Sequence, residues 1–141
     1  MKLFQIEEPD GSPTDTDAPG AAIGVDLGGL AAEVAMSVGG NAATLEDRDG
    51  FALDLSLPRA GAGLREWTEL FEGVRLRAER ALARPVTHAV VALADAALAE
   101  TVARAAAAAG IEVLRVIGRG ESPAAEAAML AEDLAPRPEV R

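Results

Sequence analysis

Apolar and polar residues alternate in short runs along the first part of the chain, with glycines between the runs. An apolar run at 22–27 contains an acid near its end and is followed by two glycines, which is typical of a buried strand leading into a tight turn. Residues 31–38 alternate loosely and predict a second strand, paired with the first across that turn. After a turn at 39–41, a short third strand is expected at 42–45 or at 51–55. The pattern therefore predicts a three-stranded meander.

The middle of the chain changes to the three- and four-residue spacing of an amphipathic helix. Its apolar stripe begins with Trp67, Leu70, Phe71 and Val74, and Pro85 ends the helix. We expect Trp67 and Phe71 to anchor the core. The opposite face alternates between acidic and basic residues, and its arginines, which we expect to be solvated, are Arg75, Arg77, Arg80 and Arg84.

The next segments alternate between strand and helix. Residues 87–93 predict a fully buried strand, and the alanine-rich stretch 96–109 predicts a helix. Asp95 is expected to cap the start of that helix, and Gly110 stands where a left-handed C-cap belongs. Residues 111–117 predict another strand.

A last helix is expected at 123–134. Ser122 is a suitable N-cap for it, and Pro123 occupies the first helical position, where proline is tolerated. The complete order is then β-β-β-α-β-α-β-α, with the first, fourth and fifth strands parallel. This order predicts an α/β fold in which helices flank a mixed sheet.

Composition indicates one domain with a polar extension at each end. Half of the 141 residues are hydrophobic, which is enough for one core. Residues 1–20 are rich in proline, glycine and acids and predict a disordered acidic arm. The single folded domain is expected at 21–135, followed by a short tail at 136–141.

The charge of the chain narrows the classes of partner. It has 13 basic and 23 acidic residues and a net charge of -10, so we expect neither nucleic acid nor an anionic membrane as a partner. The absence of cysteine excludes disulfides and thiolate chemistry. The apolar start is too short for a secretory signal, and no run approaches the roughly 20 apolar residues of a membrane-spanning helix. A cytoplasmic protein is expected.

Asp26, Gly28 and Gly29 form the candidate site with the clearest chemistry. Asp26 would stand at the carboxyl end of a strand, where open α/β sheets place their ligands. The two glycines can adopt positive φ and bring backbone N–H groups close to an anion, while Asp26 can hold Mg²⁺ through water. A tight hairpin with Asp26 as a turn acid has the same residues, so both interpretations stay open.

Four blocks carry a resemblance to a known superfamily. IGVDLGG at 23–29 resembles the first phosphate motif of actin, sugar kinases and Hsp70 chaperones. Downstream, VTHAVVAL, AAAAAGIEVLRVI and ESPAAEAAML follow the order of corresponding Hsp70 segments. The chain thus resembles the N-terminal lobe of the Hsp70/actin-like ATPase superfamily over most of 22–134. The resemblance implies a ribonuclease H-like fold.

The resemblance also implies roles for particular residues. Asp26 would serve Mg²⁺ through water, Gly28 and Gly29 would surround phosphate, and Glu121 would help arrange the attacking water and the metal. ATP or ADP with Mg²⁺ is the cofactor so implied. For Glu121 a second interpretation stays open, since an acid near the start of a helix is favoured by the helix dipole.

Several departures from the Hsp70 pattern limit this expectation. Leu30 and Ala31 replace the hydroxyl residues that follow the glycines in Hsp70, and 118–120 lacks the asparagine that precedes the family's glutamate. The second lobe of these ATPases has no counterpart in this sequence, so efficient ATP hydrolysis by the chain alone is not expected.

Three functions follow as hypotheses. The first is a truncated Hsp70-like lobe that binds nucleotide weakly. The second is a non-catalytic structural or protein-interaction module on the same fold, and the third is a sugar kinase-like half domain. A homodimer or a protein partner is expected to cover the sheet edge or the face around Gly28 and Glu121.

His88 is the only histidine of the chain. Because no cysteine accompanies it, a familiar zinc site is excluded, and we expect a histidine at a strand edge or on the surface.

Overall fold

The computed structural model describes residues 20–47 and 52–136, and the expected arm and tail lie outside these residues except for Gly20 and Pro136. The strands are β1 (Ala21–Asp26), β2 (Glu33–Val38), β3 (Asn41–Thr44), β4 (Val86–Leu93) and β5 (Glu112–Gly118). The helices are α1 (Leu64–Leu82), the short 3-10 helix η1 (Ala96–Leu98), α2 (Ala99–Ala108) and α3 (Pro123–Leu134). The predicted order β-β-β-α-β-α-β-α is confirmed, and the third strand follows the second turn directly.

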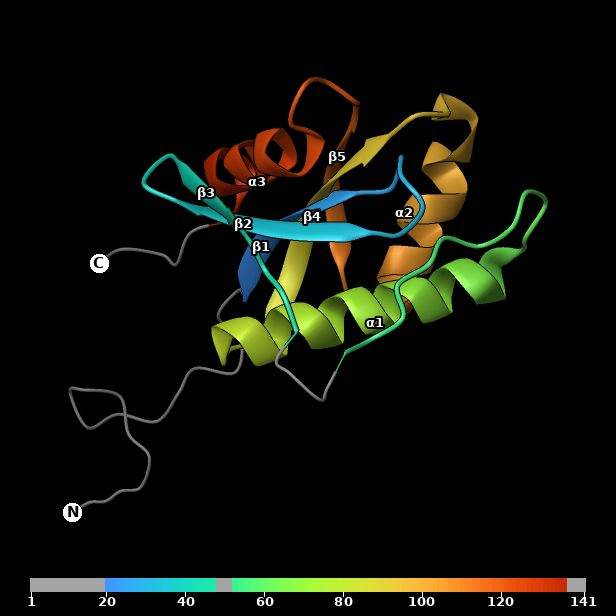
Figure 1. Ribbon diagram of the computed structural model, residues 1–141, viewed down its shortest axis with the longest axis horizontal. Helices are drawn as coiled ribbons and strands as arrows, with labels where there is room; N and C mark the ends of the chain where they lie inside the picture. The colour runs from blue at the N-terminus through green and yellow to red at the C-terminus, as the bar shows by residue number, and fades with distance from the viewer. Residues whose placement is uncertain (1–19, 48–51, 137–141) are drawn as a thin grey trace, which may run out of the picture.

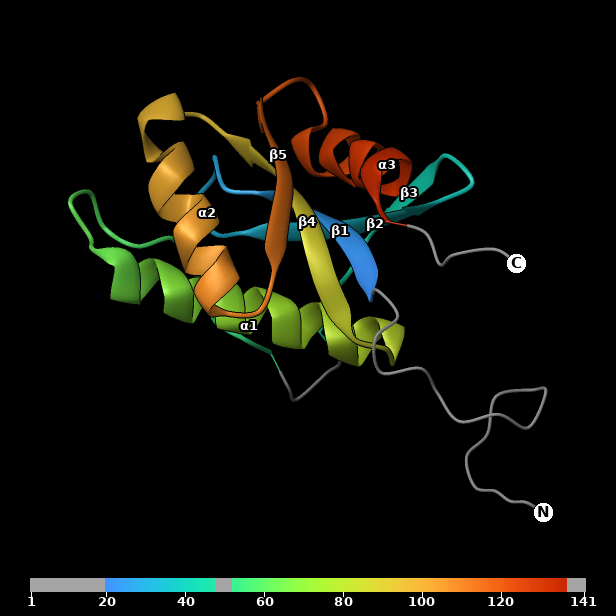
Figure 2. The same ribbon diagram turned by 180° about the vertical axis from the view of Figure 1, so that it is seen from behind.

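The strands form one mixed sheet in the order β3-β2-β1-β4-β5 (Figure 1). β1 pairs antiparallel with β2 and parallel with β4, and β4 pairs parallel with β5. β5 is an edge strand of this sheet (Figure 2). The topology confirms the predicted α/β fold and is consistent with a ribonuclease H-like architecture.

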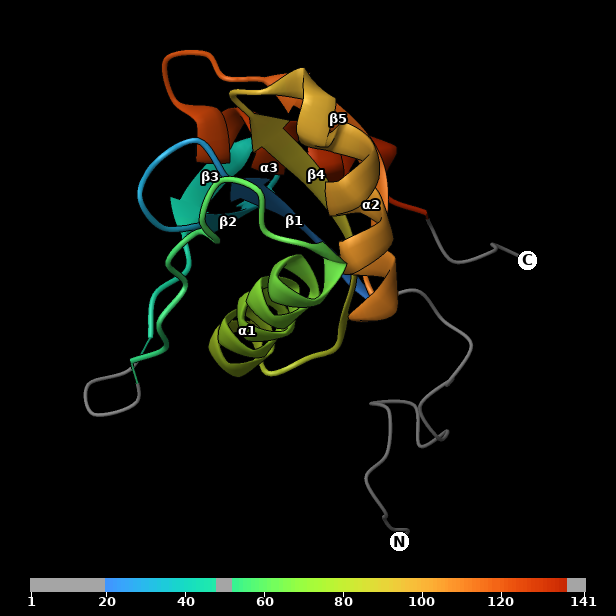
Figure 3. The same ribbon diagram turned by 90° about the vertical axis from the view of Figure 1, so that its right-hand side faces the viewer.

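Helices cover both faces of the sheet (Figure 3). α1 and α2 contact each other on one face, where Phe71 and Val74 pack with Ile23 and Val25 of β1. Trp67 is 5% exposed and Phe71 is fully buried, which confirms that both anchor the core.

The other face of the sheet holds α3, which approaches β1 closely because small residues line the contact. Gly24 of β1 faces this helix, and a Cβ atom there would overlap the backbone nitrogen of Ala128. The residues that α3 buries are all alanines: Ala124, Ala127, Ala128 and Ala131. Small side chains therefore fix the distance between α3 and the sheet.

A two-residue turn joins β2 and β3. Gly39 and Gly40 have φ values of +62° and +84°, which glycine adopts without strain, and Val38 pairs with Asn41 beyond them. Their N–H groups donate to the carboxylate of Glu132 on α3, at 2.6 and 3.0 Å. Glu132 of α3 thus holds this turn against the helix.

The helix ends agree only partly with the sequence expectations. Gly110 has a φ of +90° and ends α2 as predicted, and the Asp95 carboxylate accepts the N–H of Ala97 as a cap. Ser122 occupies the N-cap position of α3, but its hydroxyl makes no capping hydrogen bond. The Glu126 carboxylate instead accepts the N–H of Ser122, at 3.3 Å.

Arg77 on α1 contradicts the expectation that this row of arginines is solvated. Its Nε and Nη2 donate to the two carboxylate oxygens of Asp47, at 3.1 and 2.9 Å, and Nη2 also donates to the carbonyl of Leu53. Both charged side chains are largely buried, with 17% of Arg77 and 8% of Asp47 exposed. The Arg77 guanidinium and the N–H of Leu53 hold the pKa of Asp47 below its usual range. Asp47 thereby ties the segment after β3 to α1.

None of the helices in the described part of the chain is long and apolar enough to cross a membrane.

Candidate functional site

The candidate site lies at the carboxyl ends of the parallel strands. Across the sheet, Asp26 of β1 is level with Ala92 of β4, and Ala92 is level with Ile117 of β5. The loop after β1 and the loop after β5 therefore leave the sheet on the same side (Figure 3). This placement agrees with the expected position of Asp26 at the carboxyl end of its strand.

Asp26 is 3% exposed, and both oxygens of its carboxylate accept hydrogen bonds. Arg119, from the loop after β5, donates from Nε and Nη2 to the two carboxylate oxygens, at 2.9 and 3.0 Å. The N–H of Gly28 donates to the same carboxylate, at 3.0 Å. A buried carboxylate requires such compensation, and the paired geometry of arginine supplies charge and two hydrogen bonds together.

Gly28 packs against the side chain of Arg119. Neither Gly28 nor Gly29 has a positive φ, so the expected phosphate-loop conformation is not formed. A Cβ atom on Gly28 would instead overlap Cδ and Nε of Arg119. The missing side chain of Gly28 thus makes room for the arginine that covers Asp26.

The same ion pair affects Arg119. The hydrogen bonds and negative charge of Asp26 raise the pKa of the Arg119 guanidinium above its already high value, and Glu33 adds to this effect. Arg119 is therefore a permanent positive charge at this site.

Gly29 and Leu30 form an exposed tip beside this pair. Leu30 is 95% exposed, although its backbone is held in place. Its carbonyl accepts the N–H of Leu57 at 3.0 Å, and Ala31 forms an isolated bridge with Ser56. The loop thus presents a large apolar side chain to solvent from an ordered backbone.

Glu121 lies in the same loop as Arg119 but is exposed. Within residues 20–47 and 52–136, no hydrogen bond or ion pair joins it to Asp26, Gly28 or Gly29. It precedes the N-cap Ser122, so it lies just outside α3. The loop after β5 contacts Asp26 with Arg119 and not with Glu121.

Magnesium does not fit this arrangement. Mg²⁺ carries oxygen ligands and several waters, whereas the space over Asp26 and Gly28 holds the Arg119 side chain. Among the described residues, no group of three histidine or acidic side chains could hold a metal ion. Asp26 can serve a metal only after Arg119 has moved away.

Sequence reasoning missed Arg119, whose partner is 93 residues away. The signal was the register of the parallel strands, since β1 and β5 end at the same edge with only β4 between them. An arginine two residues after Ile117 was thus within reach of Asp26.

Comparisons with known proteins assign the chain to no family. The chain matches no family model, and no curated protein is significantly similar to it. The resemblance to Hsp70 and actin-like ATPases therefore stays a prediction. The structure supports an α/β fold consistent with the ribonuclease H-like architecture.

Proposed function

We propose that this chain is a non-catalytic protein-interaction domain with a ribonuclease H-like fold. The observation that carries the proposal is the Arg119 side chain, which covers Gly28 and pairs with both oxygens of Asp26. A cation built into the chain thus stands where a nucleotide's metal and phosphate would have to bind.

Phosphoryl transfer depends on positioned donors and metal ions around the transferred group. The loop offers little of this: the Asp26 carboxylate and the Gly28 N–H bond to each other, and Leu30 extends into solvent. The only hydroxyl of the loop after β5, on Ser122, lies at the start of α3. These features favour binding through a surface over catalysis.

The surface that we propose for binding is the carboxyl edge, defined by Leu30, Asp95 and Glu121. Leu30 supplies an exposed apolar contact, and Asp95 and Glu121 are exposed acids that follow β4 and β5. The net charge of -10 disfavours association of two copies, because like charges repel. We therefore assign the surface to a basic protein whose apolar pocket receives the side chain of Leu30.

Calorimetric titration with Mg-ATP and Mg-ADP tests the non-catalytic part of the proposal. We expect no binding heat from the wild-type chain at millimolar nucleotide. Saturable heat that disappears in Asp26→Ala would refute the proposal and favour a nucleotide-binding lobe.

Cross-linking tests the interaction. A photo-reactive residue at position 30 should capture a basic protein, and the same residue at position 76, which replaces another exposed leucine, should not. With the captured protein purified, Leu30→Asp should weaken its binding at least about tenfold, as expected for an apolar anchor. A cross-link to a second copy of the chain, or equal binding by Leu30→Asp, would contradict the assignment.

One observation favours a nucleotide-binding lobe as a second candidate. Asp26 and the loop that contains Glu121 occupy the sheet edge at which α/β folds bind ligands. This function requires Arg119 to leave Asp26, so Arg119→Ala is the informative variant. Nucleotide binding by Arg119→Ala but not by Arg119→Ala with Asp26→Ala would support a site that Arg119 blocks.

A further inference from the structure

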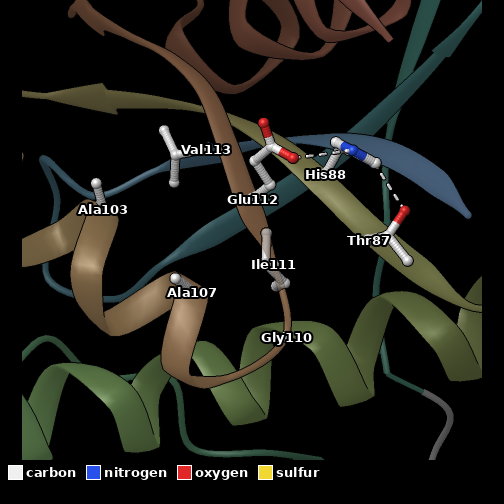
Figure 4. A pocket seen from close by; sticks show the side chains of 8 residues that line it. All are labelled: Thr87, His88, Ala103, Ala107, Gly110, Ile111, Glu112 and Val113. Atoms are coloured by element: carbon white, nitrogen blue, oxygen red, sulfur yellow. Dashed lines mark hydrogen bonds and ion pairs between the residues drawn. The ribbon is translucent and has the colours of Figure 1, made fainter. Parts of the chain in front are cut away.

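A shallow pocket of about 500 Å³ lies beside the amino end of β5 (Figure 4). Its apolar wall is built from small side chains: Ala103 and Ala107 of α2, and Val113 of β5. Because β5 is an edge strand of the described sheet, it has a neighbouring strand on one side only. The pocket thus offers room for a larger apolar side chain to pack against α2 and β5.

The rest of the rim is polar and is held in place by contacts between its own residues. Oγ1 of Thr87 is 2.7 Å from Nδ1 of His88, and Nε2 of the same ring lies 3.5 Å from a carboxylate oxygen of Glu112 (Figure 4). The side chain of His88 is 12% exposed, whereas that of Glu112 is 72% exposed. The carboxylate therefore faces solvent on one side, where it can accept a hydrogen bond from a further donor.

The chain enters the sheet directly beside this pocket. The N–H of Gly20 donates to Oγ1 of Thr87 at 2.8 Å, and the N–H of Ala21 donates to the carbonyl of Pro85 at 2.9 Å. Residues 1–19 lie outside the described residues, but they are joined to a residue that is hydrogen-bonded to the lining of the pocket. A part of this segment that folds back onto β5 therefore has only a short distance to cover.

The sequence of this segment divides into two parts. Its acids lie between Glu7 and Asp17, whereas residues 1–6 (MKLFQI) are mostly apolar. Lys2 is the only basic residue and Phe4 the only aromatic residue among the first 20. Since side chains alternate along an extended chain, Lys2 and Phe4 lie on the same side of it. An aromatic ring and an ammonium group on one side match a pocket that has an apolar wall and an exposed carboxylate.

The length of the connection favours docking within one chain. Residues 7–19 span up to about 45 Å when fully extended, and the pocket requires far less because Thr87 both lines it and binds Gly20. A short flexible connection holds two sites at an effective concentration of about millimolar. A contact that is weak between separate molecules is then well populated within one molecule.

We propose that residues 2–6 dock on this pocket of the same chain, with the ring of Phe4 against its apolar wall. Lys2 then reaches the carboxylate of Glu112. Burial of the ring supplies most of the affinity, and the charge pair fixes the direction in which the segment lies. The pocket lies at the amino end of β5, away from the carboxyl edge, so this inference goes beyond the function proposed for that edge.

Paramagnetic broadening in NMR spectra of the full chain tests the docking. Because the chain has no cysteine, Gln5→Cys provides one attachment point for a nitroxide label, on the side of the segment away from Phe4. We expect the label to broaden the amide signals of Ala107 and Val113. Phe4→Asp in the labelled chain should lower the docking equilibrium constant at least about tenfold, as expected for an aromatic anchor, and reduce the broadening accordingly. Equal broadening in both chains would overturn the proposal, since the connection alone would then bring the label near.

Two neighbouring alanines on α2 provide a matched pair of variants. Ala107 and Ala108 are both exposed, but only Ala107 lines the pocket. Ala107→Glu should abolish the broadening at Val113, and Ala108→Glu should leave it unchanged. Both variants should keep the fold, because neither substitution is made in the core. The same result for the two variants would contradict docking in this pocket.

Charge reversal tests the contact of Lys2. Lys2→Glu should weaken the docking, because it places two acids side by side, and Glu112→Lys in the same chain should restore it. If Glu112→Lys fails to restore the broadening, Lys2 does not bind at this carboxylate.

A mixed sample distinguishes docking within one chain from exchange of the segment between two copies. When a labelled chain is mixed with an isotope-enriched chain that has no label, we expect no broadening in the enriched chain. Broadening there would show that the segment of a second copy occupies the pocket and would overturn the proposal. None of these variants changes Leu30, Asp26 or Arg119, so the outcome does not depend on the function of the carboxyl edge.

Discussion

At the scale of single residues, Arg119 determines the state of the candidate site. Replacing it with methionine would keep most of the apolar side-chain stem but leave the carboxylate of Asp26 buried without a counter-charge. A buried charge that loses its partner is strongly destabilising. We expect Arg119→Met to lower the midpoint of urea unfolding.

The double variant provides the control for this prediction. Asp26→Asn combined with Arg119→Met removes both charges, so it should recover part of the stability lost in Arg119→Met. The wild-type midpoint in Arg119→Met would show that the ion pair contributes nothing to stability.

Gly28 lies against the Arg119 side chain of this ion pair. A methyl group at Gly28→Ala would take the space of Cδ and Nε of Arg119, and this flexible side chain would have to leave Asp26. We therefore expect Gly28→Ala to destabilise the wild-type chain and to have little further effect in an Arg119→Ala background. Urea unfolding of the four chains measures this; equal effects in both backgrounds would show that Gly28 acts independently of Arg119.

At the scale of elements, the contact between α3 and β1 leaves no room for a larger residue. Gly24→Ala would place a Cβ atom against the backbone of Ala128 and within 2.7 Å of the carbonyl oxygen of Ala124. Since backbone atoms of a helix cannot give way singly, α3 would have to move. We expect a loss of about 1–3 kcal/mol in the free energy of unfolding.

Gly118→Ala is the matched control for this prediction. Gly118 is also a strand glycine, but nothing lies within 4 Å of a Cβ atom there. Its replacement should change the free energy of unfolding by no more than about 0.5 kcal/mol. Similar losses in the two variants would mean that strand glycines matter here for a reason other than the contact with α3.

The elements were predictable from sequence because their signals are local. The stripe that begins at Trp67 repeats within one helix, and Gly110 stands just beyond the C-cap residue of α2. The pairing of Arg119 with Asp26 joins positions 93 residues apart and exists only once the strands are in register. For this reason the position of Asp26 was predictable, whereas its partner and the reason for Gly28 were not.

Charged residues of α1 and α3 also have partners that lie far away in the sequence and that no local signal reveals. Alternating charge on a helix usually indicates a solvated face, and no local pattern shows that Arg77 meets Asp47, 30 positions earlier. Glu132 likewise caps a turn more than 90 positions away. Long-range hydrogen bonds of charged side chains thus hold the segment after β3 against α1 and the β2–β3 turn against α3.

At the scale of the whole molecule, the ion pair between Asp47 and Arg77 makes stability depend on pH. Hydrogen bonds from Arg77 and from the N–H of Leu53 lower the pKa of Asp47 in the folded chain. Unfolding returns this carboxyl to an ordinary pKa of about 3.9, so the unfolded chain binds a proton more readily. The stabilisation is therefore complete above about pH 5 and decreases as the pH falls through the folded pKa.

Asp47→Asn makes this contribution measurable. We expect the variant to have a lower Tm than the wild-type chain near neutral pH, and the difference between the two Tm values to narrow below about pH 4. Arg77→Gln should show the same narrowing, because it removes the main cause of the shifted pKa. Parallel Tm curves for wild type and Asp47→Asn down to pH 3 would contradict this assignment. The acid loss of stability would then come from the many other carboxylates of a chain with 23 acidic residues.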